Sequence, residues 1–319
     1  MPAISASAPG KAILFGEHAV VYQRPAIAVP VHQVRAKAVV MARPGAPSGE
    51  VWIDAPDIGL NTRLDELPEQ HPFHTLIQLL KQAMGLPHLP ALHLHITSTI
   101  PLAAGLGSGA AVSVAMLRSL SAFLGHPLAD QQVCELSYEA EKYYHGTPSG
   151  IDNTVITYSQ PILFTRGQPY QILPVGGQFT LIIADSGIQS STAEMVQGVR
   201  QRYEQAVETY EARFDAMAAL VEKARHAIQK AQLELLGQLM NANHQLLQQI
   251  GVSTPQLDEL VRVAGQAGAL GAKLSGAGGG GNIIALAPQE RVDSIQAALR
   301  QAGSSRTLVS HIHPTVANR

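Results

Sequence analysis

The amino-acid sequence predicts an α+β protein built from two domains. Its 319 residues are enough for two hydrophobic cores of ordinary size. The first half is rich in short apolar and alternating segments that are typical of strands, whereas residues 192–250 have an almost wholly helical pattern. In the second half apolar runs alternate with helical segments, which indicates a sheet of roughly four strands covered by helices. We place the boundary between the two domains, residues 1–175 and 176–319, where the strand-rich pattern of the first half gives way to the pattern of the second half.

The first domain is expected to contain most of the strands. Runs of valine, alanine and isoleucine that alternate with polar residues are typical of half-buried strands. The expected strands cover residues 12–15, 26–40, 51–53, 92–96 and 154–164. Apolar residues at helical spacing predict a helix over residues 73–84, the apolar segment 110–124 predicts a buried helix, and residues 130–144, which carry three glutamates, are expected to form another. Gly85 ends the first of these helices.

The second domain is expected to begin with a strand at residues 179–184, followed by the long helical stretch of residues 192–250. We expect interruptions of that stretch near His226 and Asn241. Thr254 and Pro255 predict the start of another helix, because a capping hydroxyl precedes a proline. Apolar runs at residues 283–286 and 308–312 flank a predicted helix at residues 292–301.

Composition excludes several classes of protein. The formal net charge is −2, so no global positive field is available to hold a nucleic acid. Cys134 is the single cysteine, which excludes an intrachain disulfide and a thiolate metal cluster. The first ten residues lack the basic and apolar segments of a secretory signal, and no apolar run is long enough to span a membrane. We therefore expect a soluble cytoplasmic protein without a membrane partner.

The first glycine cluster, residues 105–109, lies between a predicted strand and a predicted helix. Glycines let the backbone approach an anion closely, and a helix N-terminus offers unpaired N–H groups and a favourable dipole. The segment is thus a candidate phosphate cradle, with a flexible turn as the alternative. It lacks the Gly-Lys-Ser/Thr ending of a P-loop and the glycine spacing of a dinucleotide-binding fold.

The second glycine cluster follows Lys273, Leu274 and Ser275, and has five glycines in the six positions 276–281. Glycine is unfavourable in regular structure, so this segment is predicted to be a loop kept thin for a ligand or another backbone. Both flanking segments have a buried pattern, which argues against a mere linker.

Three charged residues complete the set. Lys11 follows Pro9 and Gly10 near the start of the chain, Glu141 lies on a predicted helix, and Asp152 follows the turn at residues 145–150. Singly, each has a simpler explanation: a surface lysine, a solvated helical acid and a turn former. Together with the glycine clusters they supply what phosphoryl transfer needs, namely phosphate donors, a magnesium carboxylate, a lysine for developing charge and an acid near the acceptor hydroxyl.

The set of motifs resembles the GHMP kinase superfamily. Its three motifs are present in order, at residues 9–11, 101–111 and 273–281, and the resemblance runs from about Ser7 to the end of the chain. Residues 16–22 (Gly-Glu-His-Ala-Val-Val-Tyr) and 148–153 (Pro-Ser-Gly-Ile-Asp-Asn) are similar to the mevalonate kinases within it. The resemblance implies a ribosomal-protein-S5-like N-terminal domain that binds ATP and substrate, and a ferredoxin-like C-terminal domain.

The resemblance also implies a reaction and its residues. The reaction is the ATP-dependent phosphorylation of the C5 hydroxyl of mevalonate, a step of isoprenoid precursor biosynthesis, with ATP and Mg²⁺ as cofactors. Asp152 is expected to be the base and Lys11 to neutralise charge. Mevalonate is expected to contact Glu17, His18, Ser149 and Thr192. ATP phosphates are expected on Ala103, Ala104, Gly105, Leu106, Gly107, Ser108, Gly109, Ala110 and Ala111, with the loop of Gly276–Gly281, including Gly278 and Gly279, closing over the site.

The expected metal ligands are Glu141 and Ser108. The family often has two consecutive serines here, and the later one contacts Mg²⁺, whereas this chain has Ser108 followed by Gly109. Glycine has no side chain to ligate, so either Ser108 or a water molecule takes that place, because Mg²⁺ commonly keeps several waters.

Three alternatives stay open from the sequence. Another GHMP kinase, such as a phosphomevalonate or homoserine kinase, would share the fold. A diphosphomevalonate decarboxylase would share it too, although residues 16–22 argue against that lyase. A non-catalytic sensor is the third alternative, against which the joint presence of Lys11, Glu141 and Asp152 argues. The sequence allows a homodimer and does not determine the oligomeric state.

Overall fold

The computed structural model describes residues 3–101, 105–145 and 148–315. The chain forms two compact units whose segments interleave along the sequence. The first unit consists of residues 1–10, 34–101 and 107–159, and the second of residues 11–33, 102–106 and 160–319. The predicted division of the sequence at residue 175 stays a prediction, because these units are defined by contacts and not by one cut of the chain.

Within the described residues, the first sheet has seven strands in the order β4-β3-β5-β2-β6-β7, with β1 paired to β2. These strands are β1 (Ile4–Phe15), β2 (Ala26–Ala42), β3 (Val51–Ala55), β4 (Leu60–Arg63), β5 (Leu92–Ser98), β6 (Ile162–Phe164) and β7 (Gln171–Ile172). β2 runs antiparallel to β5, with Ala36 opposite Ser98 and Ala42 opposite Leu92. β3 runs parallel to β5.

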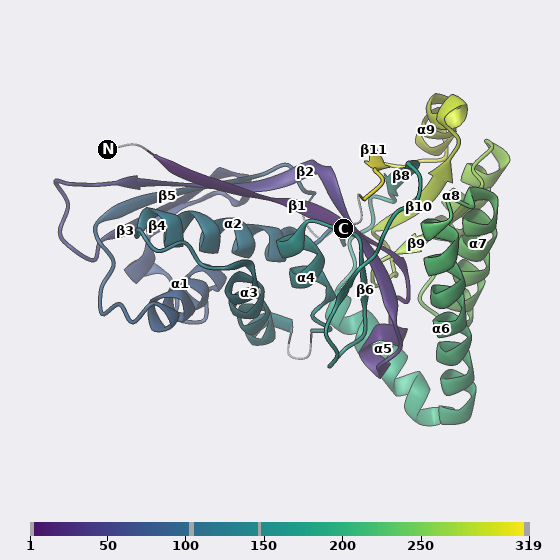
Figure 1. Ribbon diagram of the computed structural model, residues 1–319, viewed down its shortest axis with the longest axis horizontal. Helices are drawn as coiled ribbons and strands as arrows, with labels where there is room; N and C mark the ends of the chain where they lie inside the picture. Colours follow the sequence, from purple (N-terminus) through teal and green to yellow (C-terminus); the bar gives the residue numbers. More distant parts are fainter. Residues whose placement is uncertain (1–2, 102–104, 146–147, 316–319) are drawn as a thin grey trace. The chain divides into compact units, whose positions relative to one another are not determined.

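Four helices belong to the first unit: α1 (Pro72–Ala83), α2 (Ser108–Phe123), α3 (Asp130–His145) and α4 (Ile151–Tyr158). α2 packs against β5 and against the other three helices, and Figure 1 shows α1, α2 and α3 on the same side of the strands of this unit. Leu92, Leu94 and Ile96 alternate along β5 and are fully or almost fully buried. The alternation places the core of this unit between the strands and the helices.

The second unit contains a four-stranded antiparallel sheet in the order β11-β8-β10-β9, counted over the described part of the chain. Its strands are β8 (Phe179–Asp185), β9 (Gly271–Ser275), β10 (Asn282–Ala287) and β11 (Arg306–Ile312). Its helices are α5 (Thr192–Gln205), α6 (Val207–Gln229), α7 (Leu233–Gln249), α8 (Pro255–Gln266) and α9 (Val292–Gln301). α7 and α8 pack on β9 and form the core with Leu247, Leu260, Leu274 and Ile283.

Four short 3₁₀ helices complete the described secondary structure: η1 (Ala19–Tyr22), η2 (Pro56–Ile58), η3 (Leu64–Glu66) and η4 (Gln289–Arg291). No helix among the described residues is both long and apolar enough to cross a membrane.

Most predicted elements are confirmed. The α+β class, the four strands of the second half and the helix at Val292–Gln301 agree with the structure. The helix predicted to begin at Pro255 does so, and the hydroxyl of Thr254 accepts a hydrogen bond from the N–H of Leu257 at 3.3 Å.

Two predicted details are wrong. Residues 154–158 form the second half of α4 and not a strand, which is confined to β6 further on. β-branched residues favour strands, but packing of α4 against α2 and α3 overrides this weak preference. The interruption of the long helical stretch expected near His226 is confirmed at residues 230–232, whereas the one expected near Asn241 is wrong, because α7 is continuous there. A further interruption lies at Ala206.

Candidate active site

The first and second sequence motifs meet in the second unit. Lys11, in the second half of β1, is only 4% exposed. Its backbone N–H donates a hydrogen bond of 3.0 Å to the carbonyl oxygen of Leu106. Leu106 directly precedes Gly107, the residue that caps the start of α2. The predicted charge-neutralising lysine is therefore bonded to the predicted phosphate-binding segment.

The N-terminus of α2 offers backbone donors of the kind that bind an anion. Gly107 lies in the left-handed region with a φ of 74°, and no side chain caps this helix end. The N–H of Ala111 donates to Gly107 at 2.9 Å, so the helix itself leaves the N–H groups of Ser108, Gly109 and Ala110 without an intrahelical acceptor. Unpaired N–H groups and the positive end of the helix dipole suit a phosphate oxygen.

The predicted phosphate-binding residues are distributed over both units. Ala103 and Ala104 lie outside the described residues. The others divide as Gly105 and Leu106 in the second unit, and Gly107, Ser108, Gly109, Ala110 and Ala111 in the first. Gly105 has a φ of 71°, which favours glycine over any other residue.

The third motif joins the first two through Ser275. The backbone N–H of Ile13 donates to the hydroxyl of Ser275 at 3.2 Å, and that hydroxyl donates to the carbonyl oxygen of Ile13 at 2.9 Å. Gly276 lies near Gly105, because a Cβ added to Gly276 would be 3.8 Å from the backbone of Gly105. The first motif, the third motif and the part of the second motif at Gly105 and Leu106 therefore meet in the second unit.

The glycine loop, residues 276–281, is fixed on both sides by backbone hydrogen bonds. The N–H of Gly279 donates to Val252 and the N–H of Gly281 donates to Ile188, each at 2.8 Å. The hydroxyl of Ser190 donates to the carbonyl oxygen of Gly278 at 2.7 Å. These contacts hold the loop in the described conformation, and its predicted closing movement stays a prediction.

Glycine is required in this loop for space as well as for conformation. A Cβ added to Gly278 would lie 2.1 Å from the carbonyl oxygen of Val252, and one added to Gly280 would lie 2.4 Å from that of Ile188. Gly278 and Gly279 also have positive φ values of 79° and 72°. The sequence prediction of a thin loop beside another backbone is confirmed.

His18 links the glycine loop to the start of η1. Its Nε2 lies 2.8 Å from the carbonyl oxygen of Ala277, so Nε2 carries the proton and Nδ1 is the acceptor nitrogen of the ring. Burial lowers the pKa of His18 to about 4, against the opposing effect of the Ala277 hydrogen bond, and the positive charge of Arg202 lowers it further. The imidazole is therefore neutral near pH 7 and presents Nδ1 as a hydrogen-bond acceptor.

Glu17 is buried, with 1% of its surface exposed. Its Oε1 forms an ion pair with Nζ of Lys273, and its Oε2 accepts a hydrogen bond of 3.3 Å from Nδ2 of Asn243. Both carboxylate oxygens thus have protein partners. The expected contact between Glu17 and a substrate stays a prediction.

The start of α5 carries the last predicted substrate residue of this unit. Thr192 is the first residue of α5 and is exposed, while the hydroxyl of Ser191 caps the helix by accepting from the N–H of Glu194 at 3.3 Å. Ser190, which binds Gly278, is next to this cap. Thr192 is therefore two residues from Ser190, which is bonded to the glycine loop.

Asp152 lies in the first turn of α4 in the first unit. Gly150, with a φ of 91°, precedes the helix, and the hydroxyl of Thr154 donates to its carbonyl oxygen at 2.7 Å. Asp152 is half-buried. The positive end of the helix dipole favours an acidic side chain in the first turn, and α4 carries Asp152 at this position.

Glu141 and Ser149 lie near the same turn. The hydroxyl of Tyr138 on α3 donates to the carbonyl oxygen of Pro148 at 3.5 Å, and Glu141 is three residues further along α3, on the same face of that helix. Nδ2 of Asn153 donates to the carbonyl oxygen of Cys134 at 3.1 Å, which fixes α4 against α3. The expected reach of Glu141 towards this turn stays a prediction.

The structure thus groups the predicted residues into two sets. The second unit contains Lys11, Glu17, His18, Thr192, Gly278 and Gly279, and the first unit contains Ser108, Glu141, Ser149 and Asp152. Sequence reasoning gave no role to Ser190, Asn243, Lys273 and Ser275. The one available indication was a lysine and a serine inside a run that is otherwise apolar and glycine-rich.

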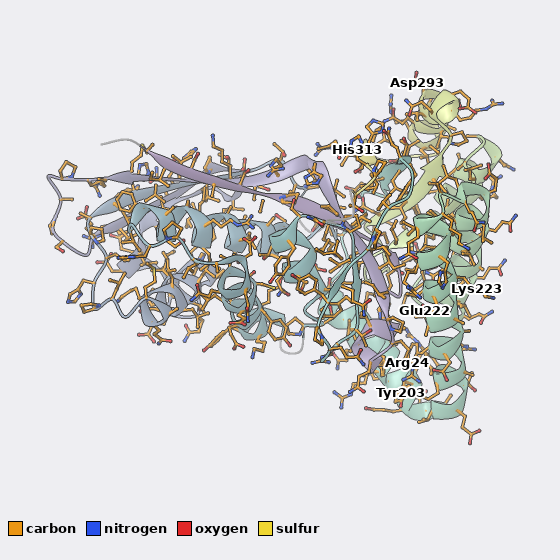
Figure 2. All side chains as sticks on the ribbon, in the orientation of Figure 1. Arg24, Tyr203, Glu222, Lys223, Asp293 and His313 are labelled. Atoms are coloured by element: carbon orange, nitrogen blue, oxygen red, sulfur yellow. The ribbon has the colours of Figure 1, made fainter. Side chains whose placement is uncertain are left out.

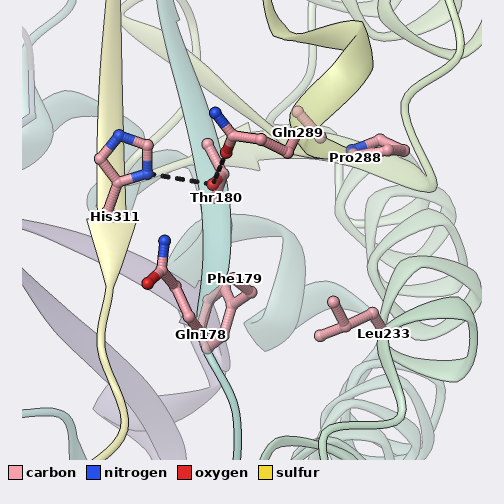
Figure 3. A pocket seen from close by; sticks show the side chains of 8 residues that line it. Gln178, Phe179, Thr180, Leu233, Pro288, Gln289 and His311 are labelled. Atoms are coloured by element: carbon pink, nitrogen blue, oxygen red, sulfur yellow. Dashed lines mark hydrogen bonds between the residues drawn. The ribbon is translucent and has the colours of Figure 1, made fainter.

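A cavity of about 450 Å³ lies elsewhere in the second unit, beside the start of β8 and the end of β10. Figure 3 shows the hydroxyl of Thr180 between His311, at 3.1 Å, and Gln289, at 3.3 Å. Three of its polar side chains are thus hydrogen-bonded to one another, and its wall contains none of the predicted site residues. We give this cavity no role in the chemistry.

Comparison with known families agrees with the motifs. Residues 72–160 match the model of the GHMP kinases N terminal domain, and residues 224–305 match that of the GHMP kinases C terminal domain.

Individual relatives match over nearly the whole chain. Mevalonate kinase of Thermococcus sibiricus is 38% identical over 94% of this chain and 93% of its own length, and the enzyme of Pyrococcus horikoshii is 38% identical with the same coverage. Among solved structures, L. major mevalonate kinase in complex with R-mevalonate has a TM-score of 0.85 and 31% identity. That match covers 98% of this chain and 97% of the L. major chain.

Proposed function

The chain belongs to the GHMP kinase family, and from this premise we propose that it is a mevalonate kinase, which phosphorylates the C5 hydroxyl of mevalonate with ATP. The observation that carries the proposal is the hydrogen bond between Lys11 and Leu106, which joins a buried lysine to the segment leading into the uncapped N-terminus of α2. The extent of identity to mevalonate kinases and the fold shared with an enzyme solved with R-mevalonate support the choice of substrate.

Each residue has one role in the proposed transfer. Asp152 accepts the proton of the C5 hydroxyl, and the oxygen forms a bond to the γ-phosphorus while the bond from that phosphorus to the β,γ-bridging oxygen breaks. The N–H groups of Ser108, Gly109 and Ala110 bind phosphate oxygens, and Lys11 offsets charge on the transferred group. ADP and 5-phosphomevalonate are the products. Positioning and electrostatic stabilisation of this kind supply most of the rate enhancement in phosphoryl transfer.

His18 contributes substrate recognition. Since its Nε2 proton is bound to Ala277, the neutral ring accepts a hydrogen bond at Nδ1, which suits a hydroxyl group of mevalonate. Thr192 and Ser149 supply further hydroxyls for the polar groups of the same substrate.

Glu141 and Ser108 fit a magnesium ion. Mg²⁺ prefers oxygen ligands and in kinases is usually held by one or two carboxylates together with phosphate oxygens. Both side chains are oxygen donors, and they lie on α3 and α2, which pack together. The bound ion would neutralise charge on the phosphate oxygens. Ser108 takes the place of the second serine of the family in this proposal.

The proposal is tested by measuring ADP release with mevalonate, phosphomevalonate, homoserine and galactose as acceptors. We expect kcat/KM for mevalonate to exceed that for each of the others by at least roughly a hundredfold, because the site is built for one set of polar groups. Preference for another acceptor would replace the substrate assignment, and ADP release equal to that without any acceptor would remove the kinase assignment.

The setting of the reaction is part of the same proposal. The product, 5-phosphomevalonate, assigns the enzyme to isoprenoid precursor biosynthesis. We propose the cytoplasm as its compartment. A homodimer is proposed as the assembly, which sedimentation of the purified protein decides.

A further inference from the structure

Residues 16–18 form a turn that carries His18, and Glu17 of this turn belongs to a buried ion pair. Lys273 is 0% exposed and Glu17 is 1% exposed, and they pair through Nζ and Oε1. Nζ of Lys273 also donates to the carbonyl oxygen of Leu274 at 2.6 Å. Removing two charges from water is costly, and a buried pair often stabilises a fold no more than apolar residues of the same size would. Such a pair calls for an explanation other than stability.

The backbone of this turn, residues 16–18, is strained. His18 has a φ of 59° and a ψ of −48°, a combination that residues with a side chain rarely adopt. Gly16 has a φ of 90°, and a Cβ there would lie 2.5 Å from the carbonyl oxygen of Pro25. Strain of this kind persists only where the surrounding structure enforces it, and it is concentrated at functional sites.

The support for this turn comes from α7 through β9. Gly237 on α7 and Gly271 on β9 pack so closely that a Cβ on Gly271 would lie 2.0 Å from the carbonyl oxygen of Gly237. Oδ1 of Asn241 accepts from the N–H of Ala272 at 2.9 Å, and Nδ1 of His244 accepts from the N–H of Leu274 at 3.3 Å. The strand that carries Lys273 is therefore held at both of its neighbouring residues.

The far side of the turn is anchored independently. The ring of Tyr22 stacks on that of Phe214 with a centroid distance of 4.5 Å, and Arg24 donates to Asp215 at 2.8 Å (Figure 2 labels Arg24). Between these anchors and β1, Glu17 ties the turn to β9 through its ion pair with Lys273. The position of His18 thus depends on the contacts of Glu17.

We propose that Lys273, together with Asn243, is a positioning residue that acts through Glu17 to hold His18 in the orientation that binds substrate. Lys273 fixes Oε1 and Asn243 fixes Oε2, which sets the backbone of residues 16–18. The imidazole then reaches Ala277 with Nε2 and presents Nδ1 to the substrate. The catalytic consequence rests on the proposed function, while the geometric consequence does not.

The test removes the two charges together, because Lys273→Met alone leaves Glu17 buried and unpaired. In Glu17→Gln with Lys273→Met, the new amide can donate to Oδ1 of Asn243, which is buried without a partner in the described structure. Thermal unfolding shows whether this double variant is folded. Lys223→Met, at an exposed position on α6 (Figure 2), is the matched control and is expected to behave as the unaltered protein.

The first readout uses no turnover. Imidazole ¹⁵N NMR of the unaltered protein is expected to show His18 as the Nε2–H tautomer, with a titration midpoint well below 6.5. The double variant is expected to show a mixture of tautomers and a midpoint closer to 6.5. An unchanged His18 spectrum in the folded double variant overturns the proposal, whether or not the protein proves to be a mevalonate kinase.

The second readout is kinetic. The double variant is expected to raise KM for mevalonate at least tenfold with a smaller change in kcat. Addition of the same two substitutions to His18→Gln is expected to change KM less than twofold, because both act through one side chain. If the factors by which the two sets of substitutions raise KM multiplied in the combined variant, Lys273 would act by another route than His18. That result would overturn the proposal.

Asn243→Ala keeps the ion pair, and it replaces the double variant as the test if that variant is unfolded. It is expected to move the His18 spectrum and KM in the same direction by a smaller factor, and no change in either overturns the proposal. An unaltered protein that fails to phosphorylate mevalonate removes the proposed function alone, because the spectrum of His18 still decides the positioning role.

Discussion

The hydroxyl of Ser275 bonds to both backbone groups of Ile13, accepting from its N–H at 3.2 Å and donating to its carbonyl oxygen at 2.9 Å. One side chain thus satisfies both the backbone donor and the backbone acceptor of Ile13, as a neighbouring strand would. Ile13 is two residues from Lys11, so this contact connects the glycine loop to the backbone that carries the lysine.

Ser275→Ala is expected to destabilise the protein and to lower turnover. Ser275 is 6% exposed and Ile13 is 8% exposed, and buried backbone groups left without a partner cost about 1–3 kcal/mol. Urea unfolding measures the loss, and Ser275→Thr, which keeps the hydroxyl, is the control. An alanine variant as stable as the serine protein would show that water replaces the hydroxyl.

Asp152→Asn and Lys11→Met are expected to reduce turnover by about 10²–10⁴ while the protein stays folded, because each removes a group that acts on the reacting atoms. Steady-state ADP release gives the rates, and circular dichroism with thermal unfolding checks the fold. Near-normal turnover in either variant would refute the role assigned to that residue.

Glu141→Gln is expected to raise the Mg²⁺ concentration needed for half-maximal turnover by at least roughly tenfold, because an amide is a weaker ligand than a carboxylate. The rate is measured against free Mg²⁺ at saturating ATP. Glu135→Gln, at an exposed position on the same helix, is the control. Equal Mg²⁺ dependence in the two variants would exclude Glu141 as a ligand.

The stability of the protein is expected to fall between pH 6.5 and pH 4 in part because of His18. Burial lowers the pKa of its imidazole to about 4, so in this range the unfolded chain binds a proton that the folded protein does not. The contribution is complete above pH 6.5 and amounts to roughly 3 kcal/mol. Urea unfolding at several pH values measures it.

The contribution of His18 is isolated with His18→Gln, which has no titrating group. The difference between the two proteins removes the effect of His244, whose pKa is also lowered by burial. If the two curves of stability against pH run parallel, His18 is not protonated on unfolding in this range.

Gly278→Ala is expected to destabilise the protein by at least about 2 kcal/mol, because it combines a left-handed backbone with a clash. Its φ is 79°, and the new Cβ would lie 2.1 Å from the carbonyl oxygen of Val252. Gly265→Ala is the matched control, since nothing lies within 4 Å of a Cβ there. Equal unfolding midpoints for both variants would mean that the glycine loop adapts without loss.

Local pattern was sufficient for most elements of the fold. The periodicity of residues 73–84 and 292–301 identified α1 and α9 to within one residue, because each helix buries one face along a continuous segment. It failed for residues 154–158, where β-branched side chains favour a strand but neighbouring helices impose a helix.

The sequence by itself determined the order of the three motifs, the family they indicate and the residue types available for phosphoryl transfer, because these depend on neighbours along the chain. Only the tertiary structure decided that Lys273 pairs with Glu17 and that Ser275 bonds to Ile13. The two residues of the first pair are 256 positions apart, and those of the second are 262 apart. Contacts at such separations form only when α7, β9 and β1 pack together, and no local propensity specifies them.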